Sequence, residues 1–335
     1  MQPEHGLSAN ERALLRGAMQ TWQPSASMQG WFPVSVGSGP DGALLHWRYL
    51  GQQALTESFF VDSLMVQEPQ QRKVCQTPLS ALDQLTEVLQ PTAFIFHVSR
   101  CGSTLLCQLL STLPTCTVIS EPPVIDALLR FQFEQQQTTQ ERVPGLRKMI
   151  LALGQKRNSL TQHFFLKFDS WHIHHLPLLR LAFPDTPCLF LYREPQAVLA
   201  SHRRQRGPQM VPYMLHPEVL PVSPDAFKEG DLDAYAAHVL QGFFQTALAS
   251  ADQLHLLNYH QLPDVVWTEI LEAYGIRHTP EQYATLQQRP AFHSKNGSLS
   301  FRGDPATPES LRQRTLSLLP SLQSSYQQLE LIRQG

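Results

Sequence analysis

The chain has 335 residues, enough to bury a sizeable core in one large domain or two small ones. Only 16% of the residues are charged and the formal net charge is −2, which excludes recruitment of nucleic acid or of an anionic membrane by an overall field. Any site for an anion must therefore be local.

The N-terminal residues MQPEHGLSANERALLRG contain no apolar segment typical of a signal peptide, and no run of about eighteen apolar residues follows. The five cysteines are scattered and lack the spacing of a disulfide framework. These features predict a soluble, cytoplasmic protein with reduced thiols.

Residues 1–90 show weak periodicity. A strand is expected at Ala43–Tyr49 and a helix around Glu57–Val66. We expect this segment to be an N-terminal extension that packs on a main domain formed by residues 91–335.

Strand-like apolar runs alternate with helical patterns from about residue 92 onward. The expected strands are Ala93–Val98, Thr117–Ser120, Phe164–Phe168, Cys188–Tyr192 and Leu254–Asn258. The expected helices are Ser103–Leu113, Val124–Phe133, Arg142–Leu153, Trp171–Phe183, Gln196–Arg204, Leu232–Ala251 and Val265–Ala273. This alternation predicts an α/β fold whose central parallel sheet of about five strands is flanked by helices.

Ligands of such sheets bind in the loops at the carboxyl ends of the strands. Residues 206–230 are rich in proline and lack a clear period, which predicts a long loop or lid. With the segment 123–140, this loop is expected to shape a substrate pocket.

The loop HVSRCGSTLL at residues 97–106 follows the first of these strands. Three functions are considered for it: a thiol nucleophile, a nucleotide triphosphate site and an anion site that depends on arginine. A cysteine phosphatase needs an arginine six positions after its cysteine, but Cys107 stands six positions after Cys101. A Walker A loop needs a lysine before its Ser/Thr, but Gly102 is followed directly by Ser103. Cys101 is therefore interpreted as a packing residue, and an ATP or GTP enzyme is disfavoured.

The third function is anion binding without a thiol or a magnesium ion. Gly102 lets backbone N–H groups converge on an anion at a helix N-terminus. Ser103 and Thr104 add hydroxyl donors, and Arg100 adds a permanent positive charge.

A second candidate anion site follows the strand at Cys188–Tyr192. There Arg193-Glu194-Pro195 turns into a helix, and Ser201 stands eight residues after Arg193, about two helical turns on. An arginine fork and a hydroxyl suit a phosphate dianion.

The two motifs SRCGST and REP…S, in this order, resemble those of the 3′-phosphoadenosine-5′-phosphosulfate (PAPS)-dependent sulfotransferases, in the branch whose 5′-phosphosulfate loop contains arginine. The resemblance spans roughly residues 92–280 and includes FLKFDSWHIHHLPLLRLAFPDTPCLFLYREP and LLNYHQL. It implies a P-loop NTPase-like sulfotransferase fold and PAPS as the sulfuryl donor, with no metal required. The residues that it assigns to PAPS are Ser99, Arg100, Cys101, Gly102, Ser103 and Thr104 at the 5′-phosphosulfate, and Arg193 and Ser201 at the 3′-phosphate.

The resemblance also implies catalytic roles. Lys167 and Arg100 would neutralise charge on the leaving phosphate. Glu121 is the base by analogy with the arginine-containing branch. Asp169 stands where another branch has a histidine base, and His172 is the nearest substitute. The family's C-terminal 3′-phosphate motif has no clean match, and the nearest candidates are Lys295 and Arg302.

The sequence thus predicts an enzyme, a PAPS-dependent sulfotransferase that acts on a hydroxyl or amine of a small-molecule acceptor. No nucleic acid and no transmembrane segment are expected, and a homodimer is compatible with the sequence. Two alternatives stay open: a P-loop kinase or other nucleotide-binding enzyme with a divergent loop, and a non-catalytic sulfotransferase-like binding module.

Overall fold

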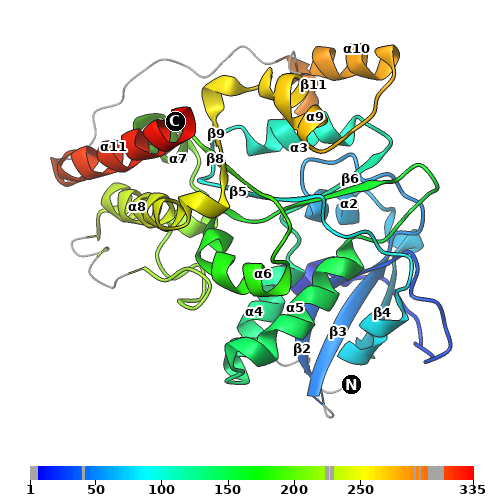
Figure 1. Cartoon of the computed structure of the whole chain (residues 1–335). Coiled ribbons are helices and arrows are strands. Elements are labelled where there is room, and N and C mark those ends of the chain that lie inside the picture. Colours follow the sequence, from blue (N-terminus) through cyan, green and yellow to red (C-terminus); the bar gives the residue numbers. More distant parts are fainter. Residues whose placement is uncertain are drawn as a thin grey trace.

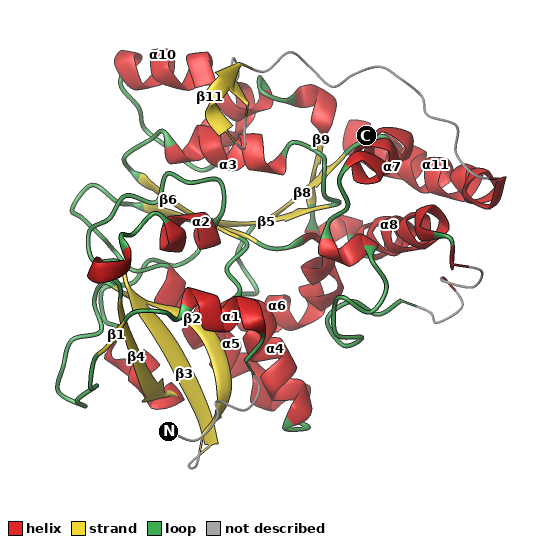
Figure 2. Ribbon diagram, turned by 180° about the vertical axis from the view of Figure 1, so that it is seen from behind, coloured by secondary structure: helices red, strands yellow, loops and turns green. Residues whose placement is uncertain are grey.

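The computed structural model describes residues 7–39, 42–222, 226, 230–289, 292–293, 296–300 and 313–335. A five-stranded sheet lies at the centre of the described part, and a four-stranded sheet lies beside it against helices α4 and α5 (Figures 1 and 2). The helices of the first half are α1 (Ala9–Leu14), α2 (Phe60–Met65), α3 (Ser103–Ser111), α4 (Val124–Glu134), α5 (Thr139–Leu153) and α6 (Leu176–Ala182). Those of the second half are α7 (Pro195–Arg204), α8 (Leu232–Ala249), α9 (Leu271–Ala273), α10 (Pro280–Gln288) and α11 (Gln313–Gln334).

The central sheet is entirely parallel, in the order β6-β7-β5-β8-β9. Its strands are β5 (Ala93–His97), β6 (Cys116–Ser120), β7 (His163–Lys167), β8 (Cys188–Tyr192) and β9 (His255–Asn258). Every residue of β5 and β8 is buried, because α3 covers one face of the sheet and α6 covers the other (Figures 1 and 2). The α/β fold class and the five expected strands are confirmed.

Residues before β5 form the second sheet, in the order β1-β4-β3-β2. Its strands are β1 (Ala18–Met19), β2 (Trp31–Gly39), β3 (Gly42–Tyr49) and β4 (Lys73–Pro78). The strand and the helix expected in this segment correspond to β3 and α2. One hydrophobic core runs through both sheets. The division of the chain at residue 90 stays a prediction.

Two expected helices differ in detail from the structure. The helix expected at 171–183 is a 3₁₀ helix at Ser170–His175 followed by α6, because Pro177 lies in the first turn of α6 and cannot donate a backbone hydrogen bond. The helix expected at 265–273 begins as a π-helix at Val266–Ile270 and continues as α9. Within 206–230, the described residues include a short 3₁₀ helix at Pro208–Met210.

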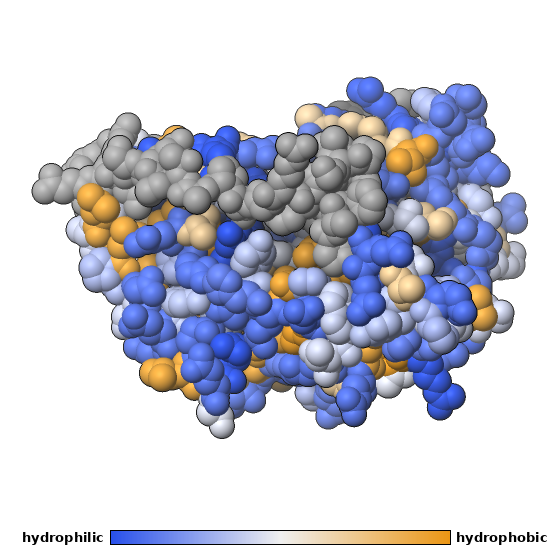
Figure 3. All heavy atoms as spheres, turned by 90° about the horizontal axis from the view of Figure 1, so that it is seen from above, coloured by the Kyte–Doolittle hydropathy of each residue, from blue (hydrophilic) through white to orange (hydrophobic). Residues whose placement is uncertain are grey.

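Part of the described chain after β9 packs on the edge of the central sheet. Helix α11 packs against α7, α8 and β9, and strands β10 (Phe292–His293) and β11 (Asn296–Ser300) form a small antiparallel pair. Within the part of the chain that is described, no helix is long and apolar enough to cross a bilayer. The face in Figure 3 is mostly hydrophilic, with hydrophobic side chains in small groups.

Gln155 joins the four-stranded sheet to the end of α5. Its side-chain oxygen accepts a hydrogen bond from the Gly30 N–H at 2.8 Å, and its amide donates to the carbonyls of Trp31 at 2.6 Å and Ala152 at 3.0 Å. The side chain is fully buried. A Gln155→Leu substitution leaves these backbone groups without their partners, so we expect it to lower the free energy of unfolding by roughly 2–4 kcal/mol.

Chemical denaturation measures this change. Gln162→Leu is the control, because Gln162 is exposed and its substitution should cost less than about 0.5 kcal/mol. Equal stability of the two variants would contradict the prediction.

Candidate functional site

A cavity of about 470 Å³ opens at the carboxyl ends of β5, β6, β7 and β8. Eleven of the residues singled out from the sequence line it: Ser99, Arg100, Cys101, Gly102, Ser103, Thr104, Glu121, Lys167, Asp169, Arg193 and Ser201. The parallel sheet explains this convergence, since all of its strands end at one edge. His172 does not line the cavity, and Lys295 and Arg302 lie outside the described residues.

The loop between β5 and α3 has an unusual backbone. Ser99, Arg100 and Gly102 all have positive φ angles, of 68°, 52° and 83°. For the two residues with side chains this conformation costs free energy, and such strain is typical of binding loops. No side chain caps the N-terminus of α3, so its first N–H groups are available to an anion.

Gly102 is where the loop passes closest to the turn after β9. A Cβ atom at this position would lie 2.6 Å from Leu262 Cδ1 and 3.0 Å from Tyr259 Cδ2. Only glycine fits here, both for its positive φ and for this close approach.

Cys101 is fully buried and its thiol donates a hydrogen bond to the Leu191 carbonyl at 3.2 Å. Burial raises the pKa of this thiol to about 11. A thiol of this kind is neither ionised near neutral pH nor exposed to a substrate, which agrees with its interpretation as a packing residue.

Lys167 ends β7 with 1% of its surface exposed. Its ammonium group lies 2.6 Å from Glu121 Oε1 and 3.4 Å from the Thr104 hydroxyl oxygen. It also lies 5.1 Å from the centre of the Phe59 ring, which comes from the N-terminal segment. Burial acts to lower the pKa of Lys167, but the Glu121 carboxylate outweighs it and the pKa is raised. The lysine is therefore a fully charged group aimed at the loop.

His97, the last residue of β5, supports the same carboxylate as a neutral donor. Its Nδ1 accepts a hydrogen bond from the Ser99 N–H at 2.9 Å, so Nε2 carries the proton. This Nε2 lies 3.1 Å from the Phe168 carbonyl oxygen and 3.3 Å from Glu121 Oε1. Burial and the Lys167 charge lower the pKa of His97, which keeps the ring uncharged.

Glu121 and Asp169 form a carboxyl pair with unequal acidity. Although burial acts to raise the pKa of Glu121, Lys167 and His97 hold it well below its usual range. Burial and the neighbouring charges of Glu121 and Asp126 raise the pKa of Asp169 well above its usual range, and its side chain is hydrogen-bonded to Glu121. Glu121 is thus the stronger acid of the pair, and Asp169 is the carboxyl group that keeps its proton to higher pH.

His172 is buried and is not among the residues that line the cavity, and both of its ring nitrogens are engaged. Its Nδ1 accepts a hydrogen bond from the Asp169 N–H at 3.2 Å, and its Nε2 donates to Asp126 Oδ1 at 2.5 Å. Asp169 and His172 together cap the 3₁₀ helix that follows β7. His172 therefore holds the turn that carries Asp169.

The second candidate anion site shares this cavity. The Arg193 guanidinium lies over the Tyr259 ring, 4.0 Å from its centre, and its Nη1 donates to the Arg100 carbonyl at 3.4 Å. Ser201 of α7 and the exposed Arg204 also line the cavity. The Arg100 side chain donates to the Gln205 carbonyl at 2.7 Å. The two motifs, about ninety residues apart in sequence, thus touch directly.

The sequence analysis did not assign several residues that line this cavity, among them His97, Phe59 and Tyr259. His97 had a weak signal, as the polar last residue of an otherwise apolar strand. Phe59 and Tyr259 had none, because each reaches the site only through tertiary packing.

The three closely spaced histidines at positions 172, 174 and 175 raise the question of a metal. His174 shares a hydrogen bond of 2.9 Å with the Thr246 hydroxyl, and His172 is bound to Asp126. Among the described residues, no group of three or more His, Cys, Asp or Glu side chains is placed to hold a metal ion.

Neither a protein-family model nor a curated protein sequence matches the chain. Among solved structures, the chain is similar to sulfotransferase STF1 from Mycobacterium tuberculosis H37Rv, with 15% identity, 62% of this chain and 72% of that chain covered, and a TM-score of 0.39. It is also similar to sulfotransferase STF9 from Mycobacterium avium, with 16% identity, 74% and 77% covered, and a TM-score of 0.44. These identities are too low to transfer the role of any residue.

The raised pKa of Asp169 predicts a measurable pH effect on stability. Folding raises this pKa above its ordinary value of 3.8, so the folded chain binds more protons than the unfolded chain and Asp169 lowers stability as the pH rises above that value. Asp169→Asn imitates the protonated acid and cannot ionise. The melting temperature of the variant minus that of the original chain should therefore increase from pH 4 to pH 8.

Asp185→Asn is the control, because Asp185 is exposed outside the cavity. A difference in melting temperature that stays constant with pH for Asp169→Asn would show that Asp169 is an ordinary, ionised carboxylate.

Proposed function

We propose that the protein is a sulfotransferase that uses PAPS as the donor and transfers the sulfuryl group to a hydroxyl or amine of a small-molecule acceptor. One observation carries this proposal. A single cavity joins a charged, buried lysine, a strained loop at a helix N-terminus and a separate arginine–serine pair, in the order that the family motifs imply. PAPS carries a 5′-phosphosulfate and a separate 3′-phosphate, so it needs two such anion-binding sites.

The residues fit the 5′ end of this donor. Arg100, Ser103 and Thr104 surround the uncapped N-terminus of α3, where backbone N–H groups favour an anion. Lys167 lies within 3.4 Å of Thr104 and can neutralise charge that develops on the leaving phosphate. Bound PAPS would supply the sulfuryl group, and this loop would keep hold of the 5′-phosphate that remains on the nucleotide after the transfer.

Arg193 and Ser201 fit the 3′-phosphate. The Tyr259 ring fixes the plane of the Arg193 guanidinium, which then presents its donors in one orientation. ATP and GTP lack a 3′-phosphate, so this pair would distinguish the donor from both nucleotides.

Glu121 is the base that the geometry favours, because it is ionised and its side chain is 22% exposed, whereas His172 is buried with both nitrogens engaged. While Lys167 is bound to it, Glu121 is a weak base. An anion that draws the lysine towards Thr104 removes the largest cause of the low pKa and strengthens the base. Donor binding would in this way prepare deprotonation of the acceptor.

The cysteines bear on where the protein works. All five are free thiols, four of them buried. Free thiols persist in a reducing compartment, so the proposal includes a cytoplasmic location.

A thermal-shift assay tests the donor. The nucleotide product of the proposed reaction, 3′-phosphoadenosine 5′-phosphate (PAP), should stabilise the protein more than ADP, ATP with magnesium or GTP, because a ligand that binds only the folded state raises its stability. A saturating ligand at one hundred times its Kd adds about 2.7 kcal/mol. Equal or larger stabilisation by ATP with magnesium would favour a nucleotide kinase. PAP binding without turnover of PAPS over a broad acceptor set would identify a binding module.

Arg193→Ala tests the 3′-phosphate assignment. We expect this variant to weaken PAP binding at least tenfold while 5′-AMP, which lacks the 3′-phosphate, binds as before, because a charge-assisted bond is worth roughly 1.5–3 kcal/mol. Titration calorimetry measures both affinities. Arg277→Ala removes an exposed arginine away from the cavity and controls for net charge. Unchanged PAP affinity in Arg193→Ala would refute the assignment.

A further inference from the structure

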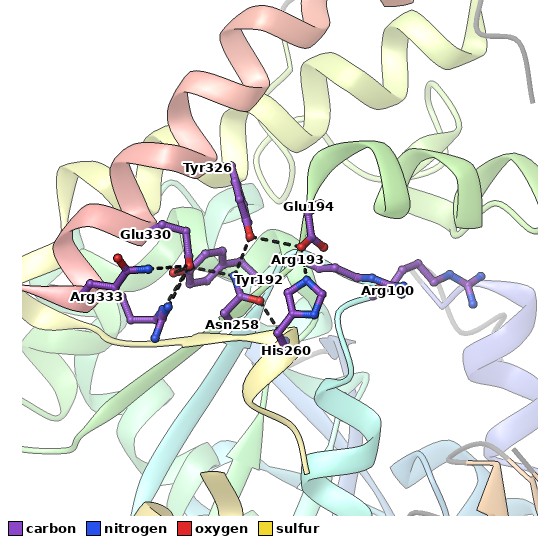
Figure 4. A network of polar contacts seen from close by, with 10 residues as sticks. Arg100, Tyr192, Arg193, Glu194, Asn258, His260, Tyr326, Glu330 and Arg333 are labelled. Atoms are coloured by element: carbon purple, nitrogen blue, oxygen red, sulfur yellow. Dashed lines mark hydrogen bonds and ion pairs between the residues drawn. The ribbon is translucent and has the colours of Figure 1, made fainter. Parts of the chain in front are cut away.

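The C-terminal helix α11 reaches the candidate anion site through a network of polar side chains (Figure 4). Three elements meet there: α11, the turn between β8 and α7, and the turn after β9. Helix α11 is already docked by apolar contacts, since Leu322 and Leu329 are fully buried. The polar network therefore calls for a separate explanation.

Glu330 is the centre of the network on α11. It accepts hydrogen bonds from the Tyr192 hydroxyl at the end of β8, from the Asn258 amide at 2.8 Å and from Arg333 at 2.9 Å. Burial acts to raise the pKa of Glu330, but these hydrogen bonds lower it to about 2. An ionised carboxylate thus holds the ends of two neighbouring strands.

Asn258 transmits this contact to the turn Tyr259–Gln261. Its side-chain oxygen accepts from the His260 N–H at 3.0 Å, and its amide donates to Glu330 and to the Tyr326 hydroxyl, the latter at 2.9 Å. The side chain is 2% exposed and all of its donors and acceptors are used. Its orientation, and with it the start of the turn, is set by α11.

Glu194 receives the second branch. The Tyr326 hydroxyl lies 3.4 Å from Glu194 Oε1, and His260 donates to the same oxygen. Figure 4 shows Glu194 directed to Tyr326 and His260, with Arg193, its neighbour in the chain, extending towards Arg100. Helix α11 therefore contacts the β8–α7 turn on either side of Arg193, at Tyr192 through Glu330 and at Glu194 through Tyr326.

The two branches converge on Arg193 and Tyr259. Asn258 precedes Tyr259 and Glu194 follows Arg193, and the tyrosine ring and the guanidinium are stacked 4.0 Å apart. Arg193 in turn donates to the Arg100 carbonyl, and Tyr259 lies against Gly102. A shift of either turn would change the orientation of the guanidinium relative to the loop.

We propose that Tyr326 and Glu330 are positioning residues for the 3′-phosphate: through Asn258 and Glu194 they hold the Tyr259–Arg193 stack in the orientation that binds this group. The inference rests on the proposed PAPS-dependent function. Polar networks add little net stability compared with apolar contacts, but hydrogen bonds between partly buried side chains fix one geometry. A geometric role accounts for polar groups on a helix that leucines already anchor.

The test compares two ligands that differ only in the 3′-phosphate. PAP and 5′-AMP are titrated calorimetrically into the full chain, into Tyr326→Phe and into Glu330→Gln. Each variant should lower the preference for PAP over 5′-AMP roughly three- to tenfold, with the affinity for 5′-AMP unchanged, because each loses a hydrogen bond that orients Arg193. Gln327→Ala, at an exposed neighbouring position of α11, should keep the original preference.

The ratio of the PAP affinity to the 5′-AMP affinity separates a positioning role from general destabilisation of the fold. Partial unfolding would reduce both affinities together and leave the ratio unchanged. Tyr326→Phe removes a single hydroxyl and keeps the ring, so it retains the test if Glu330→Gln folds poorly. If the original chain prefers PAP and both variants keep that preference, the inference is overturned and the proposed function stands. If the original chain shows no preference for PAP, the proposed function fails and the inference fails with it.

Discussion

The ion pair between Lys167 and Glu121 is the interaction on which the rest of the site depends. An ammonium group with 1% exposure needs a carboxylate in contact, because an unpaired buried charge costs several kcal/mol. The partner comes from the neighbouring strand, where the Glu121 N–H donates to the Lys167 carbonyl at 2.8 Å. Glu121 has a φ of 54°, so its backbone is held in a strained conformation at the strand exit.

This ion pair affects the protonation of the neighbouring side chains of His97 and Asp169. Lys167 keeps Glu121 ionised and, together with burial, keeps His97 uncharged. The ionised Glu121 in turn favours the neutral form of Asp169. The pair also recruits the N-terminal segment, because Phe59 covers the ammonium group. The segment before β5 therefore contributes directly to the site as well as to the core. Arg193 is positioned in a different way, because hydrogen bonds from α11 hold the residues next to Arg193 and Tyr259.

Much of the central fold could be predicted from the sequence, because buried parallel strands are continuous apolar runs and the helices between them keep a 3.6-residue period. The convergence of Arg100, Lys167 and Arg193 followed from one rule, that parallel strands end at the same edge. Two predictions failed for local reasons. Pro177 divides the helix expected at 171–183. His172, a candidate base, instead caps the 3₁₀ helix together with Asp169 and so stabilises that turn.

By itself, the sequence determined the order of the strands and helices along the chain, the loop at 97–104 and the spacing of Arg193 and Ser201. These are local properties, set by residues a few positions apart. Only the tertiary structure decided which carboxyl group keeps its proton to higher pH, that Phe59 and Tyr259 belong to the site, and that Tyr326 and Glu330 reach Arg193. Each of these depends on the distance between charges or rings on separate elements, and that distance exists only after the sheets and α11 have packed together.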